Sequence, residues 1–129
     1  MATIFSKIVD GEIPCYKVAE DDHFLAFLDV MPLCKGHVLV IPKKETDYLF
    51  DLDEKELSDL MCFAKNVAVK MKLAISCRKI GMTVIGLEVP HAHVHLIPIN
   101  TIADMDFTKP KLSLSSTEMA EISQLIMNQ

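Results

Sequence analysis

Three histidines alternate with apolar residues in segment 91–95 (His-Ala-His-Val-His), the strongest chemical signal in the sequence. The flanking segments 83–89 and 96–99 are mostly apolar and partly β-branched, which favours a β-strand. Side chains alternate between the two faces of a strand, so the three imidazoles are expected to point to one side. Ala92 and Val94 are then expected to face a hydrophobic core.

A row of imidazoles can support two kinds of chemistry. Neutral imidazole is a common zinc ligand, so a His-x-His pair on a strand could hold a metal ion. Imidazoles can also act as nucleophiles and as general acids or bases near neutral pH. The remaining alternative is a solvated strand face that is rich in histidine without a chemical role, and the regular hydrophobic spacers disfavour it.

Composition argues against several classes of protein. The net charge of −5 argues against a nucleic-acid-binding protein, which would need a basic patch for the phosphates. No apolar run approaches the roughly 20 residues of a membrane-spanning helix, and the N-terminus lacks the pattern of a secretory signal peptide. The cysteines are scattered without a Cys-x-x-Cys motif, at Cys15, Cys34, Cys62 and Cys77. We therefore expect reduced thiols in a cytoplasmic protein that binds neither nucleic acid nor membrane.

Hydrophobic periodicity predicts an α+β protein with an antiparallel sheet. Strands are expected over residues 15–19, 24–28, 37–41, 81–87 and 91–99. Asp53 and Glu56 form a capping-box pattern before a long amphipathic helix. Ser115 and Glu118 form another before a shorter C-terminal helix. No repeat or linker interrupts the chain, so residues 1–129 are expected to form one domain.

The histidine spacing is similar to the signature of the histidine triad (HIT) superfamily, and further segments resemble its Hint-like bacterial branch. The matches are Ile-Phe-Ser-Lys-Ile-Val at 4–9 with Gly-Glu-Ile-Pro at 11–14, Phe-Leu-Asp at 27–29, Gly-His-Val-Leu-Val-Ile-Pro-Lys at 36–43 and Glu-Val-Pro-His at 88–91. They cover about residues 3–100 and leave 101–129 as a C-terminal loop and helix. The resemblance implies the HIT fold, with a five-stranded antiparallel sheet, two main helices and a homodimer in which the two sheets join.

The resemblance implies active-site roles for four histidines. His93 matches the family's nucleophile, which attacks the α-phosphorus of a nucleotide and carries the nucleotidyl group until water removes it. The backbone carbonyl of His91 matches the group that holds the proton on the other ring nitrogen of this nucleophile. His95 matches the residue that stabilises the phosphate oxygens, and His37 matches a fourth histidine that pairs with His91.

The resemblance also implies a nucleoside site. Asp29 matches the aspartate that accepts hydrogen bonds from the ribose hydroxyls, although an aspartate before Pro32 is equally typical of a turn. The residues that match the lining of the purine pocket are Phe5, Ile8, Ile13, Phe27 and Val30. The implied partner is a purine nucleotide, and no cofactor is implied.

The sequence departs from the family pattern in two places. Leu87 and Glu88 stand where relatives often carry polar residues that meet the phosphate or the leaving group, and a phosphate-facing Glu88 would repel it. Thr3 and Ser6 replace a Cys-x-x-Cys pair that holds a structural zinc in many bacterial relatives. We therefore expect no metal, and the leaving group is the least constrained part of the substrate.

The leading hypothesis is a hydrolase of purine nucleoside phosphoramidates that works through a nucleotidyl-His93 intermediate. A dinucleoside polyphosphate hydrolase is the alternative enzyme, and a nucleotide-binding protein with incidental catalysis is the alternative from another class. A His-x-His metalloenzyme is disfavoured because, apart from Glu88, no carboxylate lies near the triad in the sequence.

Overall fold

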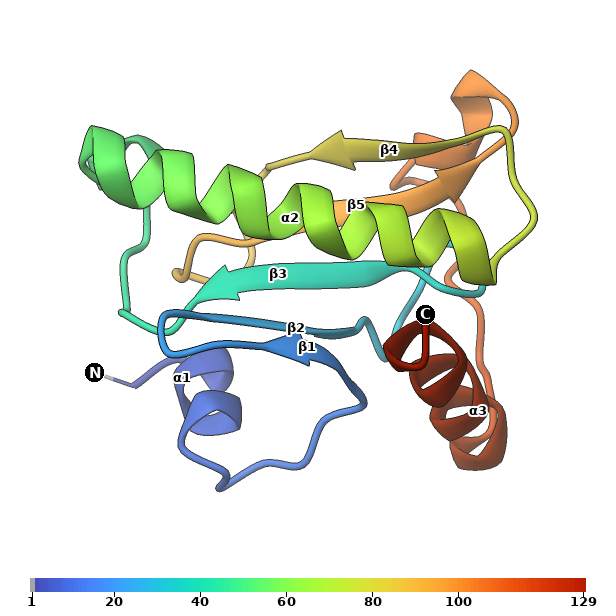
Figure 1. Cartoon of the computed structure of the whole chain (residues 1–129), viewed down its shortest axis with the longest axis horizontal. Coiled ribbons are helices and arrows are strands. Elements are labelled where there is room, and N and C mark those ends of the chain that lie inside the picture. The colour runs from blue at the N-terminus through green and yellow to red at the C-terminus, as the bar shows by residue number, and fades with distance from the viewer. Residues whose placement is uncertain (1) are drawn as a thin grey trace.

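The computed structural model describes residues 2–129, which form one antiparallel sheet, three α-helices and two short 3-10 helices. The strands are β1 (Lys17–Glu20), β2 (Phe24–Leu28), β3 (Val38–Pro42), β4 (Lys79–Thr83) and β5 (Val94–Ile99). The helices are α1 (Ile4–Val9), α2 (Glu54–Ala74) and α3 (Ser116–Met127), with 3-10 helices η1 (Leu49–Asp51) and η2 (Ile102–Met105) (Figure 1). The α+β class and the five-stranded antiparallel sheet are therefore confirmed.

The last strand in the sequence lies inside the sheet rather than at its edge. The strand order is β1-β2-β3-β5-β4, and β5 is antiparallel to both of its neighbours. His95 is consequently flanked by Leu39 of β3 and Thr83 of β4. Two ladders hold the backbone at this residue, which suits a side chain that must be positioned accurately.

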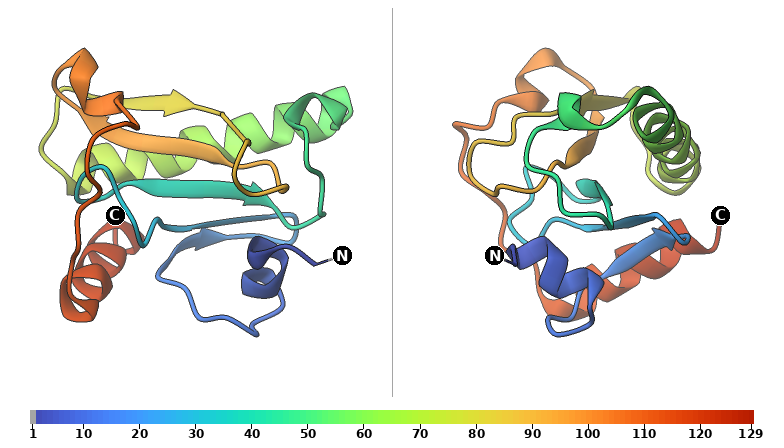
Figure 2. Two further views of the ribbon diagram at one scale, coloured as in Figure 1. Left: turned by 180° about the vertical axis from the view of Figure 1, so that it is seen from behind. Right: turned by 90° about the vertical axis from the view of Figure 1, so that its left-hand side faces the viewer.

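Both faces of the sheet are covered, and alternate strand residues join different clusters. The cluster under α2 and α3 includes Phe24, Ala26, Leu28, Val38, Val40, Ala92, Val94 and Leu96. The cluster under α1 includes Phe5, Leu25, Phe27, Leu39 and Ile41. Figure 2 shows α2 on one side of the sheet, with α1 and the loop before β5 on the other. The alternation predicted for Ala92 and Val94 is confirmed, and His95 faces away from α2.

The helix starts follow the predicted capping residues. Asp53 caps α2 by accepting the backbone N–H of Glu56, whose carboxylate accepts the N–H of Asp53 in return. Ser115 caps α3 by accepting the N–H of Glu118 at 3.1 Å. The buried stripe of α2 consists of Leu60, Ala64, Val67 and Met71. None of the helices within residues 2–129 is long and apolar enough to cross a membrane.

The predicted strand boundaries are wrong where they matter most for the triad. β4 ends at Thr83 instead of residue 87, and the following loop passes through Gly86 with φ +73°, a conformation that glycine adopts without strain. β5 begins at Val94 instead of residue 91, because β3 and β4 pair with it only from that point. His91 and His93 therefore lie in the loop that leads into the strand. β1 and β3 differ from their predicted ranges by one or two residues.

Candidate active site

A cavity of about 540 Å³ opens on the face of the sheet away from α2. Its walls come from α1, the end of β2 with the residues that follow, the loop 85–89, and a segment after η2. His93 and His95 both line it. Pro14, Cys15 and Leu39 of β3 complete the lining, so the cavity brings widely separated parts of the chain together around two imidazoles.

His93 turns one ring nitrogen to the protein and leaves the other for the cavity. Its Nδ1 donates a hydrogen bond to the backbone carbonyl oxygen of His91 at 2.7 Å. Because a carbonyl only accepts, the neutral ring carries its proton on Nδ1 and a lone pair on Nε2. The ring of Phe5 packs edge-on against this imidazole, with centroids 5.0 Å apart. Nε2 of His93 is thus an oriented candidate nucleophile.

His91 is completely buried, and both of its ring nitrogens have partners. Nε2 donates to the carbonyl oxygen of Pro42 at 2.8 Å, so Nδ1 is the acceptor of the Thr3 hydroxyl at 2.9 Å. The same hydroxyl accepts the backbone N–H of Ser6 and caps α1. His91 therefore ties the loop before β5 to both α1 and β3.

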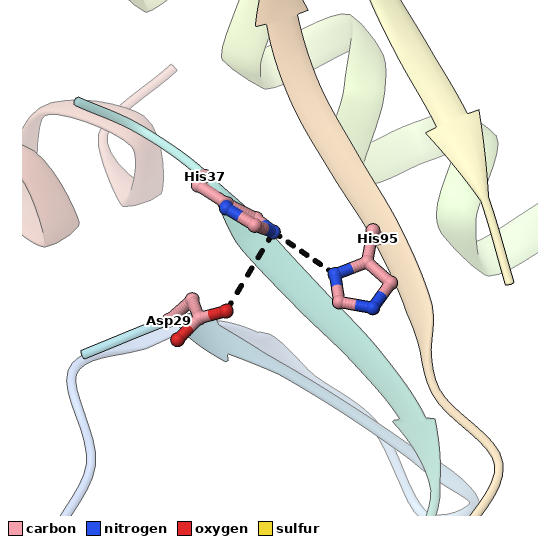
Figure 3. Close-up of side chains that lie close together, drawn as sticks. All are labelled: Asp29, His37 and His95. Atoms are coloured by element: carbon pink, nitrogen blue, oxygen red, sulfur yellow. Dashed lines mark hydrogen bonds and ion pairs between the residues drawn. The ribbon is translucent and has the colours of Figure 1, made fainter. Parts of the chain in front are cut away.

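His95 receives its orientation from His37, as Figure 3 shows. The backbone N–H of Leu33 donates to Nδ1 of His37 at 3.0 Å, so the proton of this neutral ring lies on Nε2. That Nε2–H donates to Nδ1 of His95 at 3.0 Å. The proton of His95 is consequently on its own Nε2, where it can be donated to a ligand in the cavity.

The expected pairing of His37 with His91 is wrong. His37 bonds to His95, the third histidine of the triad, and both ring nitrogens of His91 are occupied by Pro42 and Thr3. The reason is the strand register, because β3 runs beside β5 and the loop that carries His91 lies beyond the paired residues.

Burial keeps His37 and His95 uncharged at neutral pH. It lowers the pKa of His37 to about 3, with further contributions from the charges of His95, Lys111 and His93. It lowers the pKa of His95 to about 4, with a further contribution from His93. Neutral rings are what the hydrogen bond between them requires, because one nitrogen must accept.

Asp29 forms the turn considered for it from the sequence and also lies at the cavity. Its Oδ1 accepts the backbone N–H of Met31 at 2.9 Å, which is the turn-forming interaction. Its Oδ2 lies 3.7 Å from Nε2 of His37, and the residue also lines the cavity. Burial raises the pKa of this carboxyl group, while the N–H of Met31 and the charge of His93 act in the opposite direction.

Asp29, His37 and His95 have the spacing of a metal site, with ligand atoms within 4.8 Å of one another. The tertiary structure thus supplies a carboxylate that the sequence did not place near the histidines. The hydrogen bond from Leu33 nevertheless opposes a cation, because it leaves the proton of His37 on Nε2, the nitrogen that would ligate. In this arrangement His37 and His95 share a hydrogen bond, and the Asp29 carboxylate lies beside them at 3.7 Å from Nε2 of His37 (Figure 3).

The sequence profile of the HIT domain matches residues 10–102. The chain belongs to this family. An uncharacterized HIT-like protein of Borreliella burgdorferi is 37% identical over 134 aligned residues, covering 97% of this chain and 96% of the relative. Adenosine 5'-monophosphoramidase HNT1 of Saccharomyces cerevisiae is 41% identical over 98 residues, covering 75% of this chain and 62% of the yeast protein.

Solved structures of HIT proteins share the fold over nearly the whole chain. The crystal structure of a HIT-like protein from Bartonella henselae superposes with a TM-score of 0.85 at 30% identity, covering 98% of this chain and 94% of the other. A HIT family member from Bacillus subtilis gives a TM-score of 0.76 at 28% identity, with coverage of 100% and 97%. The HIT fold, with its five-stranded sheet and two main helices, is therefore established for this chain.

The remaining residues expected in the nucleoside site of this HIT protein are mostly at the cavity. Phe5, Ile8, Phe27, Val30 and Glu88 line it, whereas Ile13 is not among the lining residues. Leu87 is 88% exposed, and its neighbour Glu88 is also exposed, so both stand at the rim with access to solvent.

Sequence reasoning missed three residues that the structure places at this site. Phe107 packs edge-on against His95 with centroids 4.9 Å apart, and Lys111 lines the cavity nearby. Both follow the part of the chain that matches the HIT domain, so no motif marks them. Thr3 was noted only as a replacement for cysteine, and its bond to His91 is visible only in three dimensions.

Proposed function

We propose that the protein hydrolyses purine nucleoside phosphoramidates, such as an amide of AMP, through a covalent nucleotidyl-His93 intermediate. The observation that supports this proposal is that two neighbouring imidazoles present different groups to the cavity, one a nitrogen lone pair and the other an N–H donor. His93 offers a lone pair on Nε2 and His95 offers an N–H on Nε2, with ring centroids 4.9 Å apart. A phosphate at this point would meet a nucleophile for phosphorus and a donor for oxygen.

In the proposed first step, Nε2 of His93 bonds to the α-phosphorus and the bond from phosphorus to the leaving amine breaks. The amine departs with a proton from water. His95 donates to a non-bridging oxygen, where negative charge grows in the transition state. The carbonyl of His91 stabilises the positive charge that develops on the attacking ring. The hydroxide left from that water then attacks the same phosphorus, the bond to Nε2 breaks to restore the neutral imidazole, and the nucleotide leaves.

The proposed nucleoside site uses the apolar wall of the same cavity. Phe5, Ile8, Phe27 and Val30 offer flat and branched apolar surface of the kind that suits a purine base. Asp29 lines the cavity beside His37 and is proposed to accept hydrogen bonds from the ribose hydroxyls. This assignment follows the resemblance in sequence and is supported by the position of the carboxylate.

Glu88 favours a phosphoramidate over a dinucleoside polyphosphate. A polyphosphate leaving group carries several negative charges and would pass an exposed carboxylate at the cavity rim. An amine leaving group is neutral or positive and meets no such repulsion. The similarity to the Saccharomyces relative, an adenosine 5'-monophosphoramidase, supports the same choice.

Intact-protein mass spectrometry with an AMP phosphoramidate tests the proposal. We expect AMP release and a transient adduct of AMP mass on the wild-type protein, and neither on His93→Ala. His23→Ala is a matched control, because His23 is an exposed histidine away from the cavity. Diadenosine polyphosphate, assayed in parallel, should be the poorer substrate. AMP binding without turnover of either substrate would instead indicate a binding protein.

We further propose that two copies join along β4. This strand is an edge of the sheet, and Met82 on it is 46% exposed. Val69 and Leu73 of α2 are also exposed, at 51% and 69%. Sedimentation velocity should show a dimer that Met82→Glu weakens and that Leu125→Glu, an equally exposed position on α3, leaves intact. A monomeric wild-type protein would contradict this proposal.

A further inference from the structure

The segment 106–112 closes one wall of the candidate active site. It follows η2 and lies outside residues 10–102, which match the HIT domain. The backbone N–H of Leu112 donates to the carbonyl oxygen of Pro32 at 2.9 Å, which fastens the segment to the loop after β2. The ring of Phe107 packs against His95 and, with centroids 6.2 Å apart, against His37.

Lys111 is held within this segment in a defined position. Its Nζ donates to the carbonyl oxygen of Phe107 at 2.6 Å and to that of Lys109 at 3.3 Å. The same Nζ lies 5.7 Å from the centroid of the Phe107 ring. An ammonium group has three N–H donors, so two carbonyl partners leave one donor for a ligand.

No carboxylate among residues 2–129 lies within ion-pair distance of Lys111, although its charge acts to lower the pKa of the Asp29 carboxyl in the same cavity. The ion pairs that lysines form within residues 2–129 involve five other lysines, and none includes Lys111. Among the described residues that line the cavity, it is the only lysine or arginine, whereas Asp29 and Glu88 are acidic. Since the imidazoles of His37 and His95 are uncharged, the cavity has one fixed positive charge, on the wall that also carries Phe107.

We propose that Lys111 binds the phosphate group of the nucleotide and makes the site selective for a nucleotide over a nucleoside. This inference rests on the proposed function and adds a specificity residue from outside the matched domain. Lys111 would attract an anionic phosphate into a cavity whose acidic lining residues, Asp29 and Glu88, would otherwise repel it. Phe107 acts as a positioning residue, because it carries the carbonyl that holds Nζ and packs its ring against His95.

Calorimetric titration with AMP and with adenosine tests the assignment. Lys111→Met keeps an unbranched apolar side chain against Phe107 and removes the charge. We expect it to weaken AMP binding about tenfold or more, the usual scale for a charge-assisted contact, and to leave adenosine binding unchanged. Lys109→Met is the matched control, since Lys109 is an exposed lysine two residues away that does not line the cavity. Lys111→Arg should retain most of the AMP affinity.

Salt dependence gives an independent readout. Raising the ionic strength should weaken AMP binding to the wild-type protein more than to Lys111→Met. Equal AMP affinity in the wild type and Lys111→Met would overturn the assignment. So would parallel losses for AMP and adenosine, which indicate a structural role. A wild-type protein that binds neither ligand would overturn the proposed function itself, and this inference with it.

Discussion

The two imidazoles at the cavity, those of His93 and His95, are oriented by different kinds of hydrogen-bond partner. His93 is oriented by the main chain, through the carbonyl oxygen of His91, whereas His95 is oriented by a side chain, through Nε2 of His37. The hydrogen bond from His93 to the main chain should remain after any substitution at His91 that preserves the loop. The hydrogen bond to His95 is lost when the imidazole of His37 is removed.

The difference shows how a fold can give opposite polarity to chemically identical side chains. Nδ1 of His93 faces the carbonyl of His91, which can only accept a hydrogen bond. Nδ1 of His37, the partner of His95, faces the N–H of Leu33, which can only donate one. The proton of His93 therefore lies on Nδ1 and that of His95 on Nε2. A candidate nucleophile and a hydrogen-bond donor thus lie side by side, and the groups that orient them through hydrogen bonds are uncharged.

The largest expected effect separates the two cavity-facing imidazoles. His93→Ala should reduce turnover of an AMP phosphoramidate by about 10⁴-fold, because it removes the nucleophile. His95→Ala should cost about 10²–10³-fold, the usual loss for one donor to a developing oxyanion. Single-turnover kinetics with adduct detection measures both. If His95→Ala abolished the adduct and His93→Ala retained it, the two roles would be reversed.

The next effect compares the two orienting histidines. His37→Ala should lower kcat about tenfold, because Nδ1 of His95 loses its donor and the ring can adopt the other tautomer. His91→Ala should lower kcat less while costing several kcal/mol of stability, since a fully buried side chain with two hydrogen bonds is removed. Steady-state kinetics and urea unfolding on both variants separate these effects. A larger loss of kcat in His91→Ala than in His37→Ala, measured where both variants are folded, would contradict the orientation of His93 by the main chain alone.

The pH dependence of the free energy of unfolding reports on His37 and His95, the two histidines joined through their side chains. The folded-state pKa is about 3 for His37 and about 4 for His95, both below the usual 6.5. The unfolded chain therefore binds more protons than the folded chain between pH 4 and 6.5, so stability is lost as pH falls through this window. The two groups together should lower the free energy of unfolding by up to about 2.7 kcal/mol per pH unit.

Urea unfolding at pH 5, 6 and 7 measures this slope. His37→Asn removes one of the two titrating rings, so the slope should fall by about half. A wild-type profile that is flat over this range would show that these rings are protonated in the folded state.

The smallest expected effect on kcat concerns Thr3, whose hydroxyl bonds to the side chain of His91. Thr3→Val removes the hydroxyl that caps α1 and donates to Nδ1 of His91, and should cost about 1–3 kcal/mol of stability. Because the carbonyl of His91 remains, kcat should change less than about threefold. Thr3→Ser keeps the hydroxyl and serves as the control. A loss of kcat much greater than the loss of stability explains would show that the Thr3 hydroxyl controls the orientation of His93.

The fold class, the capping of α2 and the alternation around the triad could be predicted because they are local. Asp53 and Glu56 are three residues apart, and Ala92 and Val94 alternate with the histidines. The end of β4 was overestimated because residues 84 and 85 are as apolar as a strand, while the ladder actually stops at Thr83. Apolar content alone does not distinguish a strand from an apolar loop that lines a cavity.

The sequence by itself determined the family of this protein and the residue types available for chemistry at the candidate site. Three alternating imidazoles, an apolar N-terminal segment and an aspartate in a turn resemble the HIT family and predict a nucleotide site. These features depend on residue type and short spacing, which a linear sequence displays directly.

Only the tertiary structure decided which group each imidazole meets. The bond between His37 and His95 joins residues 58 positions apart, and that between Thr3 and His91 joins residues 88 apart. The position of Lys111 depends on how the segment after η2 passes beside the cavity on the face of the sheet away from α2. Proton positions and charge at the site follow from strand register and chain crossing, which are set by long-range packing that no local pattern encodes.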